Sequence, residues 1–458
     1  MVVRPAGSSN PYATSNRLGI VVRLIYVLLS YLIAPVVVVF LLWRGFFNRA
    51  YFDRFGERFG FTRLSVSRPA IWVHAVSVGE VQAAAPLVRE LNRKHPDIPI
   101  VITTVTPTGA QRAVDLLGDC ARHCYAPYDL PGAVARFFDA ARPALAIIIE
   151  TELWPTLYHE CGKRQVPLVL ASARISPRSV SKYRWFKSLF REALSHGIVI
   201  AAQSEKDAER FRLLGAPPER THVVGNIKFD FELPAAVLTE GRAIRQANAP
   251  QRPVWVAAST HHDEEEQMLD AHERLRRQYP DALLILAPRH PERFGLIATL
   301  LRKRGVSFIT RSSGMSCTPE TSVFLLDTLG ELPVFYAASD VAFVAGSLVP
   351  IGGHNLLEPA ALGIPVLTGP HTFNAEDIAE MLAAVGAMRE VKNSVELAAQ
   401  LASLIADPEA RRYAGAQGRK TVQENRGAVA RLLTLLDPLI PRDRLPETAN
   451  RPARNSLR

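Results

Sequence analysis

The chain is organised by a repeated pattern, in which a short continuous apolar run is followed by a longer helix-like stretch. Continuous runs rich in β-branched residues are typical of strands covered on both faces, and strands that alternate with helices form parallel sheets. The pattern breaks at a polar, proline-containing stretch near 229–252 and then restarts. The runs before the break are IWVHA (71–75), IPIVITT (98–104), ALAIIIE (144–150), PLVLASA (167–173), GIVIAAQ (197–203) and HVVGN (222–226), and those after it are VWVAAS (254–259), ALLILAP (282–288), VFLLD (323–327), VAFVAG (341–346) and IPVLTG (364–369).

Two such series joined by a linker predict an α/β fold with two Rossmann-like parallel-sheet domains that face each other across a cleft. In such sheets, ligands bind beyond the carboxyl ends of the strands. The predicted division is a polar N-terminus (1–16), a membrane anchor (17–44), a first domain (45–235), a linker (236–250), a second domain (251–436) and a polar tail (437–458).

The anchor is predicted from Leu24 to Trp43, an uncharged run of 20 residues. At about 1.5 Å per residue, a helix of this length spans roughly 30 Å, enough to cross the hydrocarbon core of a bilayer. The run is too long for a cleaved signal peptide and is followed by no cleavage site, which favours an uncleaved anchor. Two alternatives stay open: a buried core helix, or a helix that lies in the membrane interface.

Arginine is distributed unequally around this run, and the excess on its C-terminal side predicts that the domains lie on the cytoplasmic side of the membrane. Four cysteines without a CxxC pair fit a reducing compartment and argue against a structural zinc site. The arginines before the run are Arg4, Arg17 and Arg23, and those after it are Arg44, Arg49, Arg54, Arg58, Arg63 and Arg68.

The chain has 54 Lys and Arg against 44 Asp and Glu, a formal net charge of +10. This excess is compatible with nucleic acid, an anionic membrane surface or an acidic substrate. Nucleic acid is disfavoured because no zinc-finger or RRM signature is present and aromatic residues do not cluster with basic ones. No GxGxxG follows the first strand and no P-loop occurs, which argues against dinucleotide enzymes and phosphate-loop nucleotidases.

Glu80 closes the segment HAVSVGE (74–80) after the first strand and falls at the start of a helix. It is either a first-turn acid that complements the helix dipole or a general base. A helix N-terminus lowers the pKa of a carboxylate, so a base here needs a second acid or partial desolvation to raise it.

Glu150 and Glu152 end another strand, two residues apart, so an extended tip would point them to one side. Pro155 predicts a helix start directly afterwards, and Glu152 is then a candidate cap. Glu150, nearer the strand, is the better site candidate.

Arg174, Arg178 and Lys228 follow the last strands of the first series. Cations at strand ends suit an anionic ligand, although isolated arginines and lysines are commonly surface charges. Both interpretations stay open for these three residues.

In the second series, Arg289 follows a strand in the segment APRHPER (287–293) and stands beside a helix start, where phosphate binds readily. A glycine-rich segment, GSLVPIGGHNLLEP (346–359), follows another strand, and Ser347 near its start is a further anion-binding candidate.

Asn355 and Glu358 lie three residues apart on the helix that this segment opens, so they share a face. A carboxylate there would accept hydrogen bonds from ribose hydroxyls, or it is the solvated acid of a capped helix. The acidic, histidine-containing segment 260–266 is interpreted as a helix start with first-turn acids rather than a metal site. His261 and His262 are adjacent and would face different ways.

These motifs, in this order, resemble those of the 3-deoxy-D-manno-octulosonic acid (Kdo) transferases of lipopolysaccharide synthesis and cover nearly the whole body of the chain. The departures are small: the family more often has Asn at Ser172, Gly at Asp263 and Met at Leu329. None removes a charged residue from the site, although Asp263 adds negative charge near it. The matching strings are HAVSVGEV (74–81), ETELWP (150–155), SARISPRS (172–179), GNIKFD (225–230), ASTH (258–261), APRHPER (287–293), DTLGEL (327–332) and VAGSLVPIGGHNLLEPAALGIPVLTGPH (344–371).

The resemblance implies a membrane-anchored glycosyltransferase of the GT-B fold at the cell inner membrane. It implies CMP-Kdo as donor, a lipid A precursor (lipid IVA) as acceptor, and a single displacement that inverts the anomeric centre. The first domain would take the acceptor and the second the CMP-sugar, with no cofactor and no metal.

The residues that match the family's functional positions follow from the same resemblance. Glu80 matches the general base, and Glu150 and Lys228 match positions that stabilise the transition state. The CMP-binding stretches correspond to Pro288, Arg289, Leu329, Gly330, Glu331, Asn355, Leu356, Leu357 and Glu358.

Two other functions remain as alternatives. The same scaffold would serve another lipid-linked transferase with a UDP-sugar donor, which an assay of donor nucleotides distinguishes. A non-catalytic membrane scaffold would bind no nucleotide.

Overall fold

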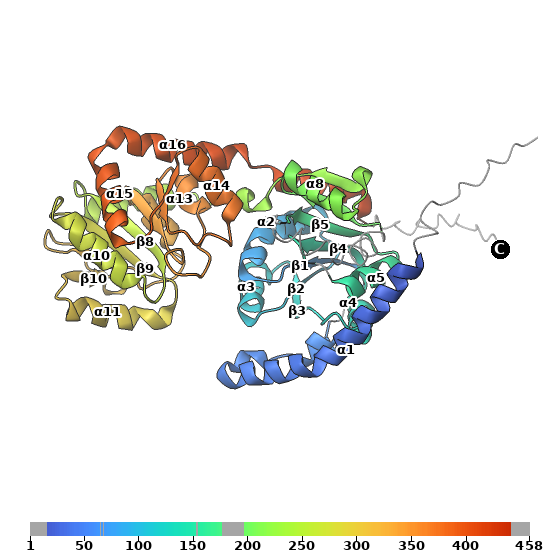
Figure 1. Cartoon of the computed structure of the whole chain (residues 1–458). Coiled ribbons are helices and arrows are strands. Elements are labelled where there is room, and N and C mark those ends of the chain that lie inside the picture. The colour runs from blue at the N-terminus through green and yellow to red at the C-terminus, as the bar shows by residue number, and fades with distance from the viewer. Residues whose placement is uncertain (1–15, 65, 67, 153, 176–196, 441–458) are drawn as a thin grey trace, which may run out of the picture. The chain divides into compact units, whose positions relative to one another are not determined.

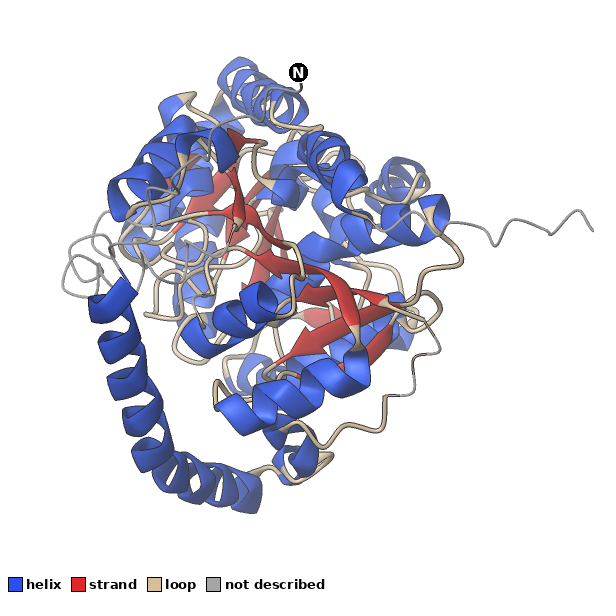
Figure 2. Cartoon of the chain, turned by 90° about the vertical axis from the view of Figure 1, so that its right-hand side faces the viewer, coloured by secondary structure: helices blue, strands red, loops and turns tan. Residues whose placement is uncertain are grey.

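Two parallel β-sheets, each between layers of helices, form the centres of two structural units (Figures 1 and 2). The computed structural model describes residues 16–64, 66, 68–152, 154–175 and 197–440. Unit 1 comprises Met1–Phe231 and Gly427–Arg458, and unit 2 comprises Glu232–Arg426. The predicted α/β class with two doubly wound sheets is confirmed, while the cleft expected between the units stays a prediction.

Unit 1 contains a seven-stranded sheet of order β3-β2-β1-β4-β5-β6-β7, in which every paired neighbour is parallel. Its strands are β1 (Ala70–His74), β2 (Ile100–Thr104), β3 (Arg122–Tyr125), β4 (Pro143–Ile149), β5 (Leu168–Ala173), β6 (Val199–Ala202) and β7 (Thr221–Val223). The described helices of this unit are α1 (Asn16–Phe47), α2 (Val78–Lys94), α3 (Pro107–Leu117), α4 (Pro131–Ala141), α5 (Pro155–Lys163), α8 (Glu205–Leu214) and α17 (Ala428–Leu436).

Unit 2 repeats the architecture with a parallel sheet of order β10-β11-β9-β8-β12-β13-β14. Its strands are β8 (Val254–Thr260), β9 (Leu283–Pro288), β10 (Phe308–Thr310), β11 (Val323–Leu325), β12 (Val341–Val344), β13 (Val366–Thr368) and β14 (Met388–Glu390). Its helices are α9 (Val237–Asn248), α10 (Glu265–Arg276), α11 (Phe294–Lys303), α12 (Leu332–Ala337), α13 (Leu357–Leu362), α14 (Glu376–Ala384), α15 (Ser394–Ala406) and α16 (Pro408–Glu424).

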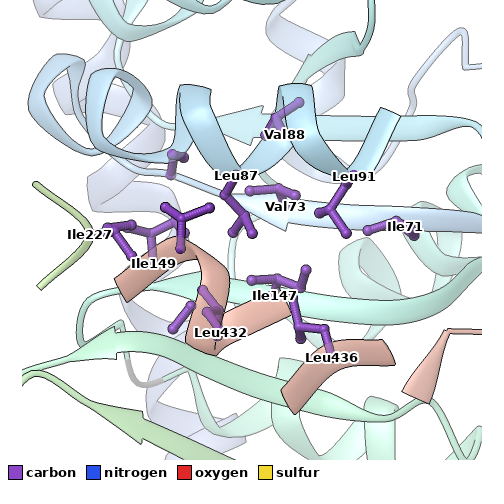
Figure 3. Packing of buried hydrophobic residues seen from close by; sticks show 14 of the residues in the cluster. Ile71, Val73, Leu87, Val88, Leu91, Ile147, Ile149, Ile227, Leu432 and Leu436 are labelled. Atoms are coloured by element: carbon purple, nitrogen blue, oxygen red, sulfur yellow. The ribbon is translucent and has the colours of Figure 1, made fainter. Parts of the chain in front are cut away.

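Successive residues of each central strand enter different hydrophobic cores, which explains why the strand sequences are continuously apolar. In β1, Trp72 packs into one core, whereas Ile71 and Val73 pack into the other, and all three are fully buried. Figure 3 shows this second core, in which side chains of β1 and β4 meet those of α2 and α17.

The helix α17 shows that the chain returns to unit 1 after completing unit 2, a crossing that the sequence analysis missed. The second domain was predicted to extend to residue 436, but α17 packs into the unit 1 core through Leu432 and Leu436 (Figure 3). The predicted linker 236–250 is also wrong, because it forms α9, whose Val237 is buried in a core of unit 2.

Asp230 lies at the end of the first segment of unit 1 and binds the start of the second segment, which begins at Gly427. Its carboxylate accepts hydrogen bonds from the backbone N–H groups of Gly427 and Val429, both at 2.5 Å, at the start of α17. The Asp230 side chain therefore caps a helix almost 200 positions later in the chain and supplies the anion that a helix N-terminus favours.

The N-terminal helix α1 is long and apolar. Its segment Val21–Phe47 covers 27 residues with a mean hydropathy of 2.7, and it is long enough to cross a membrane by length and composition. Only 6% of its most apolar window is buried, so the alternative of a buried core helix is wrong. The helix bends along its length (Figure 2) and contains Pro35, which lacks a backbone N–H. Its Tyr26 hydroxyl donates to Asp129 of the same unit at 2.8 Å.

Two strands end in irregularities that redirect the residues after them. The pairing register shifts around Ser172 in β5 and around Ser259 in β8, and both serines have positive φ, 55° and 60°. Such bulges bend a strand and re-aim the side chains that follow. Asp263 also has a positive φ of 70°, which explains why Gly is common at this position in the resembling family.

Removal of the Asp230 side chain tests how much this cap stabilises α17 in unit 1. We expect Asp230→Ala to speed hydrogen exchange of the α17 amides about 5- to 30-fold, because a lost helix cap costs about 1–2 kcal/mol. Glu424→Ala at the end of α16 is the control, since Glu424 is exposed and its contact with Lys420 lies at the surface. Unchanged exchange in Asp230→Ala would show that α17 is held by its apolar face alone.

Candidate functional site

Glu80 sits at the start of α2, where Ser77 is the N-cap and accepts a hydrogen bond from the Glu80 N–H. The Glu80 carboxylate turns back and accepts from the Val76 N–H at 2.8 Å and from the Ser77 hydroxyl at 3.0 Å. These reciprocal bonds form a capping box. Glu80 is therefore a first-turn acid of α2, as one of its two interpretations predicted. A role as a base depends in addition on its pKa.

The electrostatic environment raises the pKa of Glu80 to about 7. Burial of the carboxyl group is the largest cause, and the Glu150 charge comes next, partly offset by the hydrogen bond from Val76; the Glu152 charge adds a smaller rise. Desolvation and a second acid, the two conditions that the sequence analysis set for a base at this position, are thus both present. A carboxyl group with a pKa near 7 is matched to proton transfer at neutral pH.

Glu150 follows β4 with a positive φ of 59°, an uncommon conformation for a residue with a side chain. Its carboxylate Oε1 lies 2.5 Å from the Lys228 Nζ, and both side chains are about one-quarter exposed. The contact is an electrostatic one, because no hydrogen-bond donor within the described part of the chain is aligned with this oxygen. Two residues 78 positions apart are in this way brought to one edge of the sheet.

Glu152 does not cap α5, contrary to the alternative raised from its sequence. Its carboxylate accepts from the Trp154 indole N–H at 2.8 Å. The N–H groups of Thr156 and Leu157 at the start of α5 instead donate to Asp129, which lies far away in the sequence. Burial, and to a smaller extent the Glu150 charge, raises the pKa of Glu152, while the hydrogen bond from Trp154 opposes this rise.

The loops that follow β4, β5 and β7 are bonded to one another. The Thr151 hydroxyl contacts the backbone carbonyl of Arg174 and accepts from the Arg174 N–H at 3.1 Å. The Ser172 hydroxyl accepts from the Ile227 N–H at 3.3 Å. These bonds hold the segment that carries Lys228 against the one that carries Glu150. Arg178, the other predicted cation, lies outside the described residues.

His74 is a buried residue near this site that the sequence analysis quoted only as part of a motif. Its Nδ1 lies 2.8 Å from the Thr103 hydroxyl, which also accepts from the Trp72 indole at 2.9 Å. Burial lowers the pKa of His74 to about 4, so the ring is neutral at pH 7. Its position at the end of β1, directly before the loop to Glu80, was the signal available in the sequence.

In unit 2, a buried carboxylate binds the start of the glycine-rich segment 346–359. The fully buried Glu264 carboxylate accepts from the N–H groups of Gly346, Ser347 and Leu348, and also from that of His261. The backbone N–H groups of the glycine-rich segment were predicted to bind the anion of a ligand. Three of them already bind the Glu264 carboxylate.

Ser347 is accordingly not an open anion donor in this structure. Its hydroxyl donates to the Val344 carbonyl at 2.7 Å and accepts from the Gly369 N–H at 2.8 Å, and the residue is fully buried. The serine is part of the packing between β12 and β13.

The other predicted nucleotide-binding residues lie at the carboxyl ends of unit 2 strands, or in the loops and helix starts that follow them. Asn355 donates to Glu358 at 3.0 Å, so the two share a face as their spacing predicts. Glu331 forms an ion pair with Arg311 at 2.7 Å, which together with its hydrogen bonds lowers its pKa. The remaining residues are placed as follows: Pro288 ends β9, Arg289 follows it, Leu329 is exposed, Gly330 has a φ of 86°, and Leu356 and Leu357 are buried.

The segment 260–266 contains no metal cluster. Throughout the part of the chain that the structure describes, no group of three or more His, Cys, Asp and Glu side chains is arranged to hold a metal ion. His262 is exposed and lies 2.6 Å from Asp263, whereas His261 turns toward His354, so the adjacent histidines face different ways as expected.

The cause of the raised Glu80 pKa can be tested by titration. In a chain labelled with ¹³C-carboxyl glutamate, we expect the Glu80 signal to titrate near pH 7. Glu150→Gln should lower this midpoint without returning it to the ordinary 4.5, because burial is the larger cause. Glu90→Gln, an exposed change on the same helix, should leave it unchanged. A midpoint near 4.5 in the unaltered chain would refute the assignment of Glu80 as a base.

Comparisons with known proteins agree with these features. The family described as 3-deoxy-D-manno-octulosonic-acid transferase (kdotransferase) matches residues 53–231, and the glycosyl transferases group 1 family matches residues 254–421. The 3-deoxy-D-manno-octulosonic acid transferase of Haemophilus influenzae is 41% identical over 424 residues, covering 92% of this chain and 99% of that protein. That of Bordetella pertussis is 38% identical over 379 residues, covering 80% and 86%.

A solved structure supports the fold alone. The UDP-GlcNAc 2-epimerase of Neisseria meningitidis, bound to UDP-GlcNAc, is 16% identical and has a TM-score of 0.53, with 81% of this chain and 100% of that chain covered. The sequence relationship and the two parallel sheets agree, and the chain belongs to the 3-deoxy-D-manno-octulosonic acid transferase family of GT-B glycosyltransferases.

Proposed function

We propose that this chain transfers Kdo from CMP-Kdo to the primary hydroxyl of a lipid A precursor, lipid IVA, in lipopolysaccharide synthesis. The observation that carries the proposal is Glu80, whose pKa is raised to about 7 beside the Glu150–Lys228 pair. Unit 1 binds the acceptor and unit 2 binds the CMP-sugar. Family membership supports Kdo transfer, and the site residues support its chemistry.

In the proposed step, Glu80 takes the proton of the acceptor hydroxyl while its oxygen attacks the anomeric carbon of Kdo. The bond from this carbon to the CMP phosphate oxygen breaks, and CMP leaves with the electron pair. Attack from the face opposite to CMP inverts the anomeric centre. Positive charge develops on the sugar, where the Glu150 carboxylate, which lies 2.5 Å from the Lys228 Nζ, stabilises it.

The donor is proposed to bind at the strand ends of unit 2. Pro288 and Arg289, the segment Leu329–Glu331 and the segment Asn355–Glu358 hold CMP, with the Glu358 carboxylate placed to accept from ribose hydroxyls. Arg289 meets the charge of the departing phosphate, and no metal or cofactor takes part in the proposal.

A donor with one phosphate fits this unit better than a UDP-sugar does. A diphosphate is commonly cradled by the free N–H groups of a glycine-rich loop. Here three of these N–H groups donate to Glu264. This arrangement favours CMP-Kdo over the alternative UDP-sugar donor, and the anionic donor also accounts for a local share of the +10 net charge.

Substitution of Glu80 tests the reaction directly. We expect Glu80→Gln to reduce transfer from CMP-Kdo to lipid IVA about 10²- to 10⁴-fold, measured by mass spectrometry of the lipid product. In the unaltered enzyme the rate should rise as the pH rises through about 7, because the base acts in its deprotonated form. Glu90→Gln on the exposed face of α2 is the matched control and should retain full activity.

Three results would count against the proposal. Undiminished transfer by Glu80→Gln would refute the assignment of Glu80 as the base. A product formed only from a UDP-sugar would refute CMP-Kdo as the donor. Loss of activity in EDTA would show that the reaction needs a metal ion. Because product mass identifies donor and acceptor together, these outcomes are distinguishable in one assay.

The chain is further proposed to be held at the cell inner membrane by α1, with both units on the cytoplasmic side facing an anionic leaflet. We expect Leu28→Glu combined with Leu32→Glu to move the protein into the soluble fraction, since these side chains are 70% and 71% exposed on α1. Leu213→Glu, equally exposed at 68% on α8, is the control. Trypsin should digest the units in inside-out vesicles only, and digestion in right-side-out vesicles would reverse the orientation.

A further inference from the structure

Three histidines from three separate loops of unit 2 gather at the carboxyl ends of β8, β9 and β12, and none of them is used in the function proposed above. The rings of His261 and His354 are stacked, with 4° between their planes and 5.0 Å between centroids. The His290 ring meets His261 edge-on, with centroids 5.3 Å apart. His261 and His354 are half-buried and His290 is exposed, so the cluster is open to a ligand from solution.

The contact between the two stacked rings fixes where their protons lie. The Nε2 atoms of His261 and His354 are 2.8 Å apart, so one ring must donate its N–H and the other must accept. The accepting ring then carries its own proton on Nδ1. The pair thus retains an N–H donor for an outside partner, and it can bind one more proton when a negative charge approaches.

The charges around the cluster are positive. Burial is the main cause that lowers the pKa of His261 to about 4 and of His354 to about 3, and the nearby Arg289 lowers both further. His290 acts on both rings, and Arg293 acts on His261. Both stacked rings are therefore neutral at pH 7 while the positive field around them is unbalanced.

The three acids Asp263, Glu264 and Glu265, which follow His262 in the sequence, are engaged with other partners. Glu264 faces inward to four backbone N–H groups, and Glu265 forms an ion pair with Arg293 at 2.6 Å. Asp263 pairs with the exposed His262. Among the described residues, no carboxylate forms an ion pair with Arg289, so its charge is available to a ligand.

The backbone holds the rings in this arrangement. Glu264 accepts from the N–H of His261 and from three N–H groups of the loop that leads to His354, and so connects the two ring-bearing loops through one buried carboxylate. Gly346 has a φ of 71°, and a Cβ there would lie 2.9 Å from the His354 ring. The His354 ring is thus packed directly on a glycine that leaves room for it.

We propose that His261, His354 and His290, together with Arg289, form an oxyanion-binding site that takes a charged group of the donor, either its phosphate or its sugar-acid carboxylate. The inference rests on the proposed function for the identity of the donor. Because the loop amides bind Glu264, the oxyanion is held by side chains, and the imidazole N–H groups and the guanidinium supply the hydrogen bonds. Glu264 is a positioning residue for this site.

The test compares CMP with cytidine, which lacks the phosphate, and uses free Kdo as the ligand that carries the sugar-acid carboxylate. Calorimetry on the full chain in detergent, near pH 8 where the CMP phosphate is fully ionised, measures binding of CMP, of cytidine and of free Kdo. We expect His261→Gln and His354→Gln each to weaken the binding of one of the two anions, CMP or Kdo, about tenfold. The affinity for cytidine should stay unchanged. His262→Gln, next in sequence but turned to solvent, is the matched control and should change nothing.

Each outcome has a defined meaning. Selective loss of CMP affinity assigns the site to phosphate, and selective loss of Kdo affinity assigns it to the carboxylate. Equal loss for CMP and cytidine, or no loss for either anion, would overturn the proposal. Imidazole NMR signals of the unaltered chain give a readout that does not depend on folding of the variants: CMP or Kdo should shift the His261 and His354 signals, and cytidine should not.

Failure of the proposed function is separately visible. If the unaltered chain binds no cytidine nucleotide but binds UMP, the donor assignment fails while the histidine site is still tested by comparing UMP with uridine. Absence of ring shifts with every bound anion would overturn the histidine site alone.

Discussion

Burial of both faces of two parallel sheets is the constraint on which this structure depends. A parallel sheet needs helices on both sides, so the interior of each strand is apolar and unavailable for chemistry. Charged groups can therefore gather only where the strands end, and the chain places them there in both units. The same requirement explains α17, because the face of β1 and β4 that α2 only partly covers is completed by Leu432 and Leu436 (Figure 3). The end of the chain is thus part of the first unit's core.

Three carboxylates, Glu80, Glu150 and Glu152, lie close together at the strand ends of unit 1. Burial and the Glu150 charge raise the pKa values of Glu80 and Glu152, and Lys228 forms its ion pair with Glu150. This arrangement costs stability above pH 4.5, because a carboxyl group whose folded pKa is raised is held against its tendency to ionise. At the strand ends of unit 2, the stacked rings of His261 and His354 lie near Arg289, and Glu264 and Glu265 are engaged within the unit.

Most of the fold and part of the site could be predicted from the sequence, and the failures have physical reasons. Central strands are continuous apolar runs, whereas β3, β10 and β14 lie at sheet edges, are short and carry polar residues, so no run revealed them. Position after a strand correctly predicted that Glu80, Glu150 and Lys228 lie beyond strand ends of unit 1, while their roles stay predictions. Local spacing could not reveal that Asp129 rather than Glu152 supplies the α5 cap, that Glu264 occupies the loop amides, or that His261 meets His354. Each of these depends on contacts between distant segments, as does the return of α17.

The buried carboxylate of Glu264 also affects the conformational entropy of the glycine-rich loop at the proposed donor site. Ordering a backbone segment costs about 1–2 kcal/mol per residue in conformational entropy. Many loops become ordered only when the ligand binds, so they lose conformational entropy at binding and recover it when the ligand dissociates. Here the segment Gly346–Leu348 is already ordered by hydrogen bonds within the protein. If the proposed donor binds beside this segment, its arrival need not order the segment and its departure need not disorder it, so the loop stays in place between successive turnovers.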